Sequence, residues 1–264
     1  MKARFVIFLT CGLTAFSLGI SAQDFDYTIK STEISTIKIR ISRSELKLSG
    51  SSSKGKISIH ANEFETSNDI RAEGLTPVTP WPENTGVGFH ISEENGIISI
   101  IKTNGNVEGK YEISIPKNAN VEIEETEWYG GSFDIQNLSG NLTMKSNTSN
   151  ITLKNVSGSI HVKSTSGEIN ADLTSLSSGY SHKIATVSGT INLIILEQAP
   201  LSLKLETISG AIHTDFDVKM EKEYKGSTLY RIGNLRKAEV DLNGGGDRIK
   251  ATSVSGLVKV SFAQ

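Results

Sequence analysis

The chain of 264 residues has little cysteine, little proline, few aromatic side chains and no excess of charge of either sign. Its single cysteine, Cys11, excludes a disulfide scaffold and a zinc module built on several cysteines. Lysine and arginine number 27 against 29 aspartate and glutamate residues, and this balance excludes a polybasic nucleic-acid binder. Hydrophobic residues make up 37% and charged residues 21%, both low for a globular protein, while 24 glycines indicate many turns.

Residues 1–22 have the pattern of a secretory signal peptide. Lys2 and Arg4 precede an apolar stretch, and Ser21 and Ala22 supply a small-residue cleavage site before Gln23. The stretch holds about 16 residues, which is short for a membrane span of roughly 20, and no second such segment follows. We therefore expect the mature protein to be extracytoplasmic, in the periplasm, on the outer-membrane surface or secreted, with no transmembrane segment after cleavage.

A nine-residue repeat runs through the centre of the chain. Its corner residues are Gly131, Gly140, Ser149, Gly158 and Gly167, so that a serine departs from the pattern once. Residues two and four positions after each corner are apolar, which is the alternation of a strand with one buried face. We expect the corner glycines to permit positive φ. Each unit is predicted to be a turn followed by a short strand.

Two unlike units alternate, which predicts a structural period of two units. A shift of 18 residues aligns Asn137 with Asn155 and Ile151 with Ile169. A parallel β-solenoid, or β-helix, with about 18–22 residues per coil produces this pattern, because equivalent side chains then stack about 4.8 Å apart. A meander of antiparallel hairpins is the alternative, in which such stacking is not required.

We expect a single all-β domain over residues 23–264, because no stretch with a helical period follows residue 22. Residues 126–264 form its regular repeat part, with 217–247 as the largest insertion. Residues 23–125 are less regular, and their strands are expected to pack onto the solenoid or cap it. Within them, the strands around Leu48 and Ile57 are predicted to be a hairpin or an adjacent pair.

The signal peptide, the strand end Ile113–Lys117 and the recurring Val-Ser-Gly-x-Ile units together resemble a known family. It is the putative adhesin family of bacterial secreted proteins, long catalogued as a domain of unknown function. The segments 157–162, 166–171 and 188–193 carry the likeness. The resemblance covers roughly 110–264 well and 23–109 loosely, and it implies a β-solenoid-like fold outside the cytoplasm with no catalytic residues.

The residue pattern predicts no catalytic, metal or cofactor site. Five histidines are scattered without the spacing of metal ligands and are expected to be solvated: His60, His90, His161, His182 and His213. Asp215, Asp217 and Asp241 are the carboxylates to consider for glycoside chemistry, but the outward positions of the repeat form no acidic stripe. The segment 244–247, Gly-Gly-Gly-Asp, is a single copy and is expected to be an ordinary turn.

Five asparagines at or near the corners begin Asn-x-Ser/Thr triplets: Asn137, Asn141, Asn147, Asn150 and Asn155. Glycosylation is one interpretation. We prefer another, in which asparagine side chains stack at the corners and bond to the asparagine of the next coil.

Four aromatic residues are candidates for a ligand surface: Trp128, Tyr129, Tyr224 and Tyr230. Exposed rings can stack on sugars. For Trp128 and Tyr129 we favour the alternative that they cap an open end of the solenoid, where strand edges would otherwise be unpaired.

The sequence thus favours a secreted, non-enzymatic, structural or adhesin-like protein of the cell envelope. The second hypothesis is a protein that binds or degrades a polysaccharide through the insertion 217–247. Expected partners are a cell-surface glycan or an envelope protein, and not nucleic acid. A third hypothesis is self-association through the last strand, Val258–Phe262.

Overall fold

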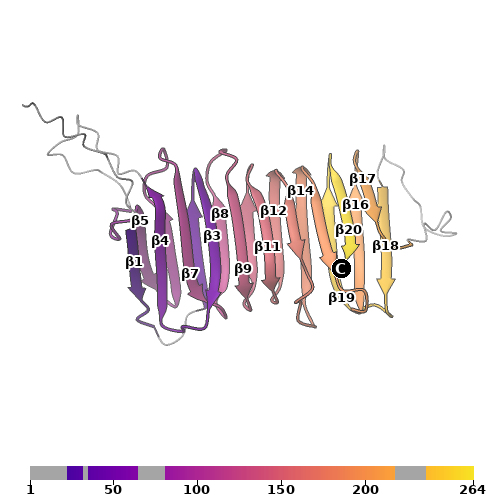
Figure 1. The fold of residues 1–264 in the computed structure, drawn as a ribbon, viewed down its shortest axis with the longest axis horizontal. Coiled ribbons are helices and arrows are strands. Elements are labelled where there is room, and N and C mark those ends of the chain that lie inside the picture. Colours follow the sequence, from indigo (N-terminus) through magenta and orange to yellow (C-terminus); the bar gives the residue numbers. More distant parts are fainter. Residues whose placement is uncertain (1–22, 32–34, 65–80, 218–235) are drawn as a thin grey trace, which may run out of the picture.

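The computed structural model describes residues 23–31, 35–64, 81–217 and 236–264, which form an all-β fold with no helix among them. Figure 1 shows its strands standing side by side along the long axis of the molecule. They belong to two large sheets of ten strands each, which enclose one continuous apolar core. No helix in these residues is long and apolar enough to cross a membrane.

The first sheet, sheet A, consists in spatial order of β1 (Gln23–Thr28), β4 (Lys56–Phe64), β7 (Gly109–Pro116), β3 (Ser44–Ser51), β9 (Ser132–Leu138), β11 (Asn150–Val156), β13 (Ile169–Asp172), β15 (Ile191–Ile195), β20 (Leu257–Phe262) and β17 (Ala211–Thr214). Sheet B consists, again in spatial order, of β18 (Arg236–Leu242), β16 (Leu201–Thr207), β19 (Asp247–Ser253), β14 (Ser181–Ser188), β12 (Ile160–Ser166), β10 (Leu142–Ser146), β8 (Asn120–Glu125), β2 (Thr36–Ile41), β6 (Ile97–Lys102) and β5 (Phe89–Glu94).

In the central coils, parallel strands pair with equivalent residues in register. Phe133 pairs with Ile151, Ile151 with Ile169, and Ile169 with Ile191, so the register advances by 18, 18 and 22 residues. Sheet B repeats this arrangement from β8 to β14. The predicted parallel stacking over residues 131–171 is therefore confirmed, and the antiparallel meander is excluded there.

At both ends of the solenoid, the order of the coils in space differs from their order in the chain. The coil of β2 and β3 lies between that of β6 and β7 and that of β8 and β9. Likewise, the coil of β19 and β20 lies between that of β14 and β15 and that of β16 and β17. Antiparallel strands finish both sheets at one end, β1 and β4 in sheet A and β5 in sheet B. At the other end, sheet B is finished by the antiparallel β18, whereas sheet A ends in the parallel strand β17.

This threading corrects two expectations. Strands β3 and β4 are neither a hairpin nor neighbours, because β7 lies between them and pairs with both. The last strand, β20, has no free edge for self-association, because it pairs with β15 on one side and β17 on the other. Self-association by strand addition needs an unpaired edge, so the expectation that Val258–Phe262 mediates it is wrong.

Glycine recurs at the corners because neighbouring coils approach closely there. A Cβ on Gly158 would lie 2.3 Å from the carbonyl oxygen of Gly140, and one on Gly189 would lie 2.0 Å from that of Gly167. Among the corner residues of the repeat only Gly167 has a positive φ, 98°. The expectation that positive φ explains these glycines is therefore wrong, and steric exclusion between coils replaces it.

Asparagine supplies the positive φ instead, three residues before the corner glycines Gly140 and Gly158. Asn137 and Asn155 have φ of 60° and 52°, a conformation that asparagine adopts more readily than most residues. The Asn155 amide donates to the Asn137 side-chain oxygen at 2.7 Å, across adjacent coils. Asn141 and Asn150 accept backbone N–H groups of the next coil through their side chains. The predicted bonding from asparagine to asparagine is therefore confirmed for Asn137 and Asn155, whereas Asn141, Asn147 and Asn150 bond backbone groups of neighbouring coils instead.

A column of polar side chains points into the interior at one corner of sheet B. It occupies register-equivalent positions of successive strands: Glu125, Ser146, Ser164, Thr186, Ser253 and Thr207. Glu125, buried to 6% exposure, accepts hydrogen bonds from the hydroxyls of Ser146 and Ser149 at 2.6 and 2.5 Å and from two backbone N–H groups. Ser149 therefore replaces glycine at its corner because its hydroxyl serves this buried carboxylate.

Candidate functional site

Trp128 and Tyr129 lie in the turn between β8 and β9. The Trp128 side chain is 65% exposed and Tyr129 is half-buried. Their coil is flanked on both sides, by β2 and β3 and by β10 and β11. Capping of an open end, the role we favoured for them, is therefore wrong, and they form an exposed aromatic corner on the side of the solenoid. Tyr224 and Tyr230 lie outside the described residues.

A groove of about 290 Å³ adjoins this corner, and Trp81 forms part of its wall. Glu127, the residue before Trp128, lines the same groove. The guanidinium of Arg40 lies 5.5 Å from the centre of the Trp81 ring, within the range of a cation–π contact. Trp81 keeps 40% of its surface exposed, so part of the ring is open to solvent. The full lining is Arg40, Ser42, Trp81, Ile101, Lys102, Thr103, Gly105, Thr126 and Glu127.

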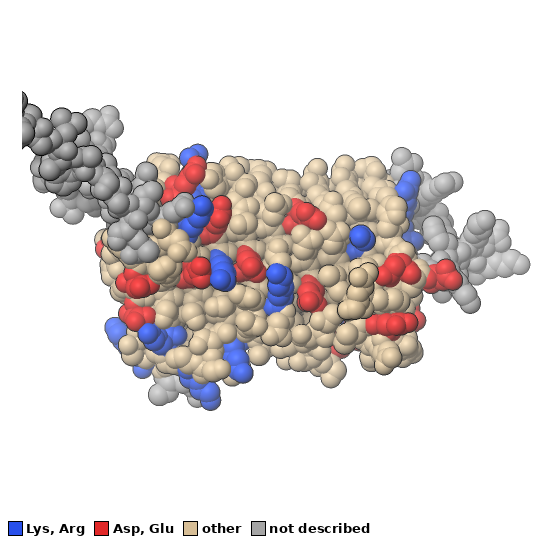
Figure 2. Space-filling model, viewed as in Figure 1, with Lys and Arg blue, Asp and Glu red and all other residues tan. Residues whose placement is uncertain are grey.

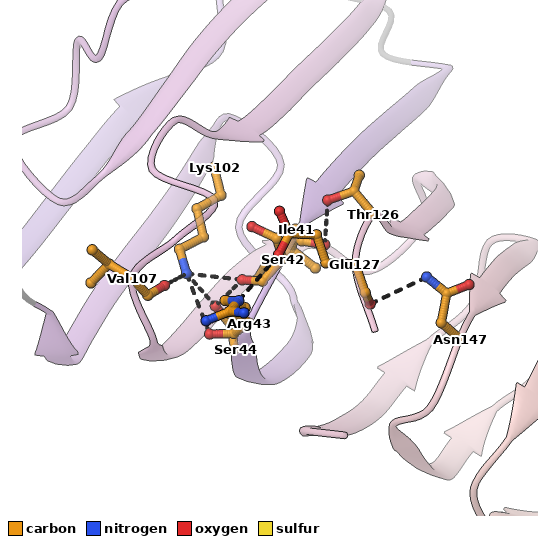
Figure 3. A network of polar contacts seen from close by, with 9 residues as sticks. All are labelled: Ile41, Ser42, Arg43, Ser44, Lys102, Val107, Thr126, Glu127 and Asn147. Carbon is orange, nitrogen blue, oxygen red and sulfur yellow. Dashed lines mark hydrogen bonds and ion pairs between the residues drawn. The ribbon is translucent and has the colours of Figure 1, made fainter. Parts of the chain in front are cut away.

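The wall of the groove is fixed by the buried side chain of Lys102, which is 8% exposed (Figure 3). Its ammonium donates hydrogen bonds to the backbone oxygens of Ser42 and Val107, at 2.9 and 2.5 Å, and to the Ser44 hydroxyl at 2.8 Å. Burial lowers the pKa of Lys102 to about 8, while Glu127 and Glu108 oppose that shift. Because its donors are taken up by the chain, Lys102 is a structural cation that ties β6 to the corner after β2.

That corner contains Arg43, whose φ of 44° is unusual for a residue other than glycine. Arg43 Nε donates to Glu127 Oε2 at 3.1 Å, which joins the corner after β2 to the turn that carries Trp128 (Figure 3). Thr126 adds a backbone bond to Ile41 at 2.9 Å, and the Asn147 amide donates to the Glu127 carbonyl at 3.2 Å. The turn that carries Trp128 is therefore held from both neighbouring coils.

Tyr129 has a defined hydrogen-bond partner. A hydrogen bond to Glu108 raises the pKa of the Tyr129 hydroxyl above its ordinary value, because the neighbouring carboxylate disfavours the phenolate. Trp128 and Tyr129 follow Glu127 in the chain, and Glu127 lines the polar groove together with Trp81. From here on, the name aromatic corner includes Trp81 as well as Trp128 and Tyr129. This combination suits a ligand that offers apolar faces and hydroxyls together, which is the character of a sugar.

The carboxylates considered for glycoside chemistry have other partners. Asp241 in β18 accepts a hydrogen bond from the Ser202 hydroxyl at 2.6 Å, within a larger groove of about 620 Å³ on sheet B. Asp215, which follows β17 in the other sheet, accepts from the Phe262 N–H at 2.9 Å. Asp217 is exposed. The described residues contain no group of three or more histidine, cysteine, aspartate or glutamate side chains placed to hold a metal ion.

His182 departs from the expected solvation of the histidines. It is 1% exposed, occupies an inward position of β14, and neither ring nitrogen has a hydrogen-bond partner. Burial lowers its pKa below the ordinary value, while Asp247 opposes that shift and His161 adds to it. By contrast, His60 lies on the outer face beside Asp24, which raises its pKa. His161 and His213 are exposed as predicted.

Trp81, Arg40 and Lys102 were not among the residues predicted from the sequence, although one of them carried a signal. Ile98, Ile100 and Lys102 share the inward parity of β6, so the alternation places a lysine among buried positions. Glu125 and His182 show the same signal in β8 and β14. A polar side chain at a position that the alternation of a strand points inward therefore indicates a buried polar group. Trp81 lies outside the strands, and no local pattern connects it with Arg40.

Comparison with known proteins gives a match to one family model. The family described as Toastrack DUF4097 matches residues 142–247, from the start of β10 to the start of β19. No curated protein matches the chain.

Several solved structures are similar. One is a putative cell adhesion protein from Clostridium sporogenes, with 10% identity and a TM-score of 0.48, covering 92% of this chain and 100% of that one. A putative adhesin from Bacteroides fragilis has 8% identity and a TM-score of 0.27, covering 93% and 98%. A putative lipid binding protein from Parabacteroides distasonis has 13% identity and a TM-score of 0.32, covering 92% and 97%. We transfer no ligand from these proteins.

Proposed function

We propose that the protein is an extracytoplasmic, non-enzymatic, adhesin-like module that binds a carbohydrate at the aromatic corner. The signal-peptide pattern of residues 1–22 supports the location. The observation that carries the binding role is the partly exposed ring of Trp81 in a groove whose wall is tied down by Lys102 and Glu127, with the exposed Trp128 directly after Glu127 in the chain. A preorganised wall favours binding, because little ordering is needed when the ligand arrives.

The test is a glycan array probed with the purified protein, followed by the variants Trp81→Ala and Trp128→Ala. Both rings are substantially exposed, so their loss leaves the core intact. Tyr180→Ala is the matched control, because Tyr180 is 39% exposed in the loop between β13 and β14. We expect each tryptophan variant to weaken binding about tenfold, which corresponds to roughly 1.4 kcal/mol, and the control to leave it unchanged.

Full binding by both tryptophan variants would overturn the proposal. A parallel reducing-end assay addresses the polysaccharide-degrading alternative, because glycosidic cleavage releases new reducing ends from a bound polymer. Accumulation of such ends, in a reaction that depends on the same corner, would replace the adhesin-like role by an enzymatic one.

A further inference from the structure

The outer face of sheet B carries a group of basic side chains in its central strands. Outward positions of β10, β12 and β14 hold Lys145, Lys163, Lys183 and His161, all of them exposed. We call these four residues the cationic strip. No aspartate or glutamate occupies an outward position of these three strands, and among the described residues none of the three lysines forms an ion pair within 4 Å.

Both flanks of the strip are built differently. On the N-terminal side, Lys38 pairs with Glu122 at 3.1 Å and Arg40 with Glu124 at 3.2 Å, in register across β2 and β8. On the C-terminal side, Lys250 Nζ forms an ion pair with Glu206 Oε2 at 2.9 Å. Lys145 lies beside Glu124 in register, but that carboxylate is engaged by Arg40. Interspersed charge is also seen on the face that Figure 2 presents. The cationic strip therefore differs from both flanks of sheet B, where basic and acidic side chains form ion pairs.

The parallel register makes this difference costly to the fold. Lys145 pairs in register with Lys163, and Lys183 pairs with both His161 and Lys250. Adjacent strands lie about 4.8 Å apart, and like charges directly opposite one another destabilise a sheet. The flanks show that the same framework accommodates acidic partners. Lys163 and Lys183 have no acidic residue beside them in register, and this is explained if an anionic ligand supplies the counter-charges.

We propose that the cationic strip binds a linear acidic polysaccharide that runs along the solenoid axis. Lys145 and Lys163 lie directly opposite each other, and Lys183 lies one strand further on, opposite His161 and two residues away from the register row of Lys163. The charges therefore follow a stepped line across three successive strands. The strand spacing is comparable with the length of one sugar unit in an extended chain, so a polymer with a carboxylate on each unit carries charge at a similar density.

Shape and chemistry favour a polysaccharide over other polyanions. Proteins that bind membrane surfaces combine basic side chains with several large apolar ones that enter the lipid, whereas the outward positions of β10, β12 and β14 hold one large apolar side chain, Val187. Single-stranded nucleic acid is bound with the help of aromatic stacking platforms, and the same positions hold no aromatic ring other than His161. These strands therefore attract a polyanion mainly by Coulomb interaction, which salt weakens.

The strip lies on the same outer face as the groove with Trp81, because Arg40, Glu124, Lys145 and Lys163 occupy one register row across β2, β8, β10 and β12. The inference deepens the proposed function, since it assigns an acidic character to the bound sugar. Its residues, however, are separate from the tryptophans of the aromatic corner, so each site can be tested alone.

The experiment measures binding of polygalacturonate, with its fully methyl-esterified form as a probe of the same backbone without charge. The variant Lys145→Gln/Lys163→Gln/Lys183→Gln is compared with Lys117→Gln/Lys154→Gln/Lys259→Gln. The second variant loses the same charge from exposed positions in or beside sheet A. Thermal unfolding monitors the fold, and the first variant should melt no lower than the unchanged protein, because a repulsion has been removed.

We expect the unchanged protein to bind the acidic polymer more tightly than the ester, with an affinity that falls as salt rises. The strip variant should lose at least tenfold in affinity, and the matched variant less than twofold. Equal losses in both variants, equal affinity for the ester, or a stronger strip-dependent affinity for anionic phosphatidylglycerol vesicles would each overturn the inference. If the strip variant binds normally while Trp81→Ala does not, the inference fails and the proposed function stands. If Trp81→Ala binds normally while the strip variant does not, the proposed role of the aromatic corner fails and the inference about the strip stands.

Discussion

The central coils and the end coils of this solenoid are built from similar strands, but they are connected differently. From β8 to β15 each step along the chain adds the next coil in space, and equivalent residues such as Ile151 and Ile169 pair in register. At the two ends, one coil is inserted between coils that are distant from it in sequence: Ile37 pairs with Val121, 84 residues further on. Local repetition therefore specifies the centre, whereas long-range contacts specify the ends.

The two regions also differ in what protects them. In the centre, each strand pairs on both sides with the equivalent strand of a neighbouring coil, and the corner glycines allow the coils to approach closely. At the ends, antiparallel strands take three of the four outermost positions, β1 in sheet A and β5 and β18 in sheet B, while the short parallel strand β17 takes the fourth. An exposed parallel edge is open to pairing with other chains, so the antiparallel strands and the shortness of β17 limit such pairing. Substitutions placed in one region and matched in the other can test this contrast.

The largest effect is expected from a charge in the central core. Ile160 is fully buried in β12 between β10 and β14, and Ile160→Asp would place a carboxylate there without a partner. Burial of an unpaired charge costs several kcal/mol, which approaches the total stability of a domain, about 5–15 kcal/mol. We expect loss of the cooperative unfolding transition in circular dichroism.

Ile212→Asp is the matched variant at the end of the stack. Ile212 is half-buried in β17, the outermost strand of sheet A. We expect that variant to fold and to melt at a lower temperature than the unchanged protein. A soluble Ile160→Asp variant with a cooperative transition would contradict the stacked core.

A smaller loss is expected from a single methyl group at a central corner. Gly158→Ala places a Cβ 2.3 Å from the carbonyl oxygen of Gly140, so the coils must move apart locally. Overpacking of this kind typically costs about 1–3 kcal/mol. Gly55, before β4 in the end region, has no atom within 4 Å of an added Cβ, and Gly55→Ala should change stability by less than about 0.5 kcal/mol. Urea unfolding measures both, and equal effects would refute the close-approach explanation.

The smallest effect concerns the boundary between the two regions, where His182 in β14 contacts the inserted strand β19. Burial lowers the pKa of His182, so the unfolded chain binds its proton more tightly than the folded one. His182 therefore costs stability as the pH falls through the ordinary histidine pKa of about 6.5. We expect His182→Leu to raise stability by about 1 kcal/mol at neutral pH, because unpaired ring nitrogens are removed, and by more at pH 5.

The measurement for His182 is chemical unfolding at pH 7.5 and pH 5. His60→Gln is the control with the opposite sign, because Asp24 raises the pKa of His60 and its contribution is lost as the pH rises. An unchanged acid dependence in His182→Leu would show that the buried imidazole does not titrate with unfolding.

The predictable parts of the fold are those that the repeat determines. The two-residue alternation around Ile151 and Ile169 identified the buried face, and the 18-residue shift identified the partner coil. The corner asparagines were also predictable, because Asn137 and Asn155 recur at that same shift. The reason for the corner glycines was not, since the carbonyl oxygens that a Cβ would meet belong to a neighbouring coil.

The ends and the site were beyond local reasoning. The strand Val258–Phe262 comes last in the sequence, and only its pairing with β15 and β17 shows that it is internal. Trp128 and Tyr129 were candidates for a ligand surface because of their ring chemistry, although capping was preferred for them. Trp81 was not a candidate, because it comes from an irregular segment between β4 and β5. Lys102 was detectable from its inward parity, and its partners were not.

The inserted coil at the C-terminal end separates two coils that follow one another in the chain. Before β19 and β20 are in place, the coil of β16 and β17 is paired with β18 but not joined to the coil of β14 and β15, because β19 and β20 lie between them. These coils therefore cannot stack in the order of the chain. Removal of residues 247–262 would consequently break the junction between two coils rather than strip off an outer layer.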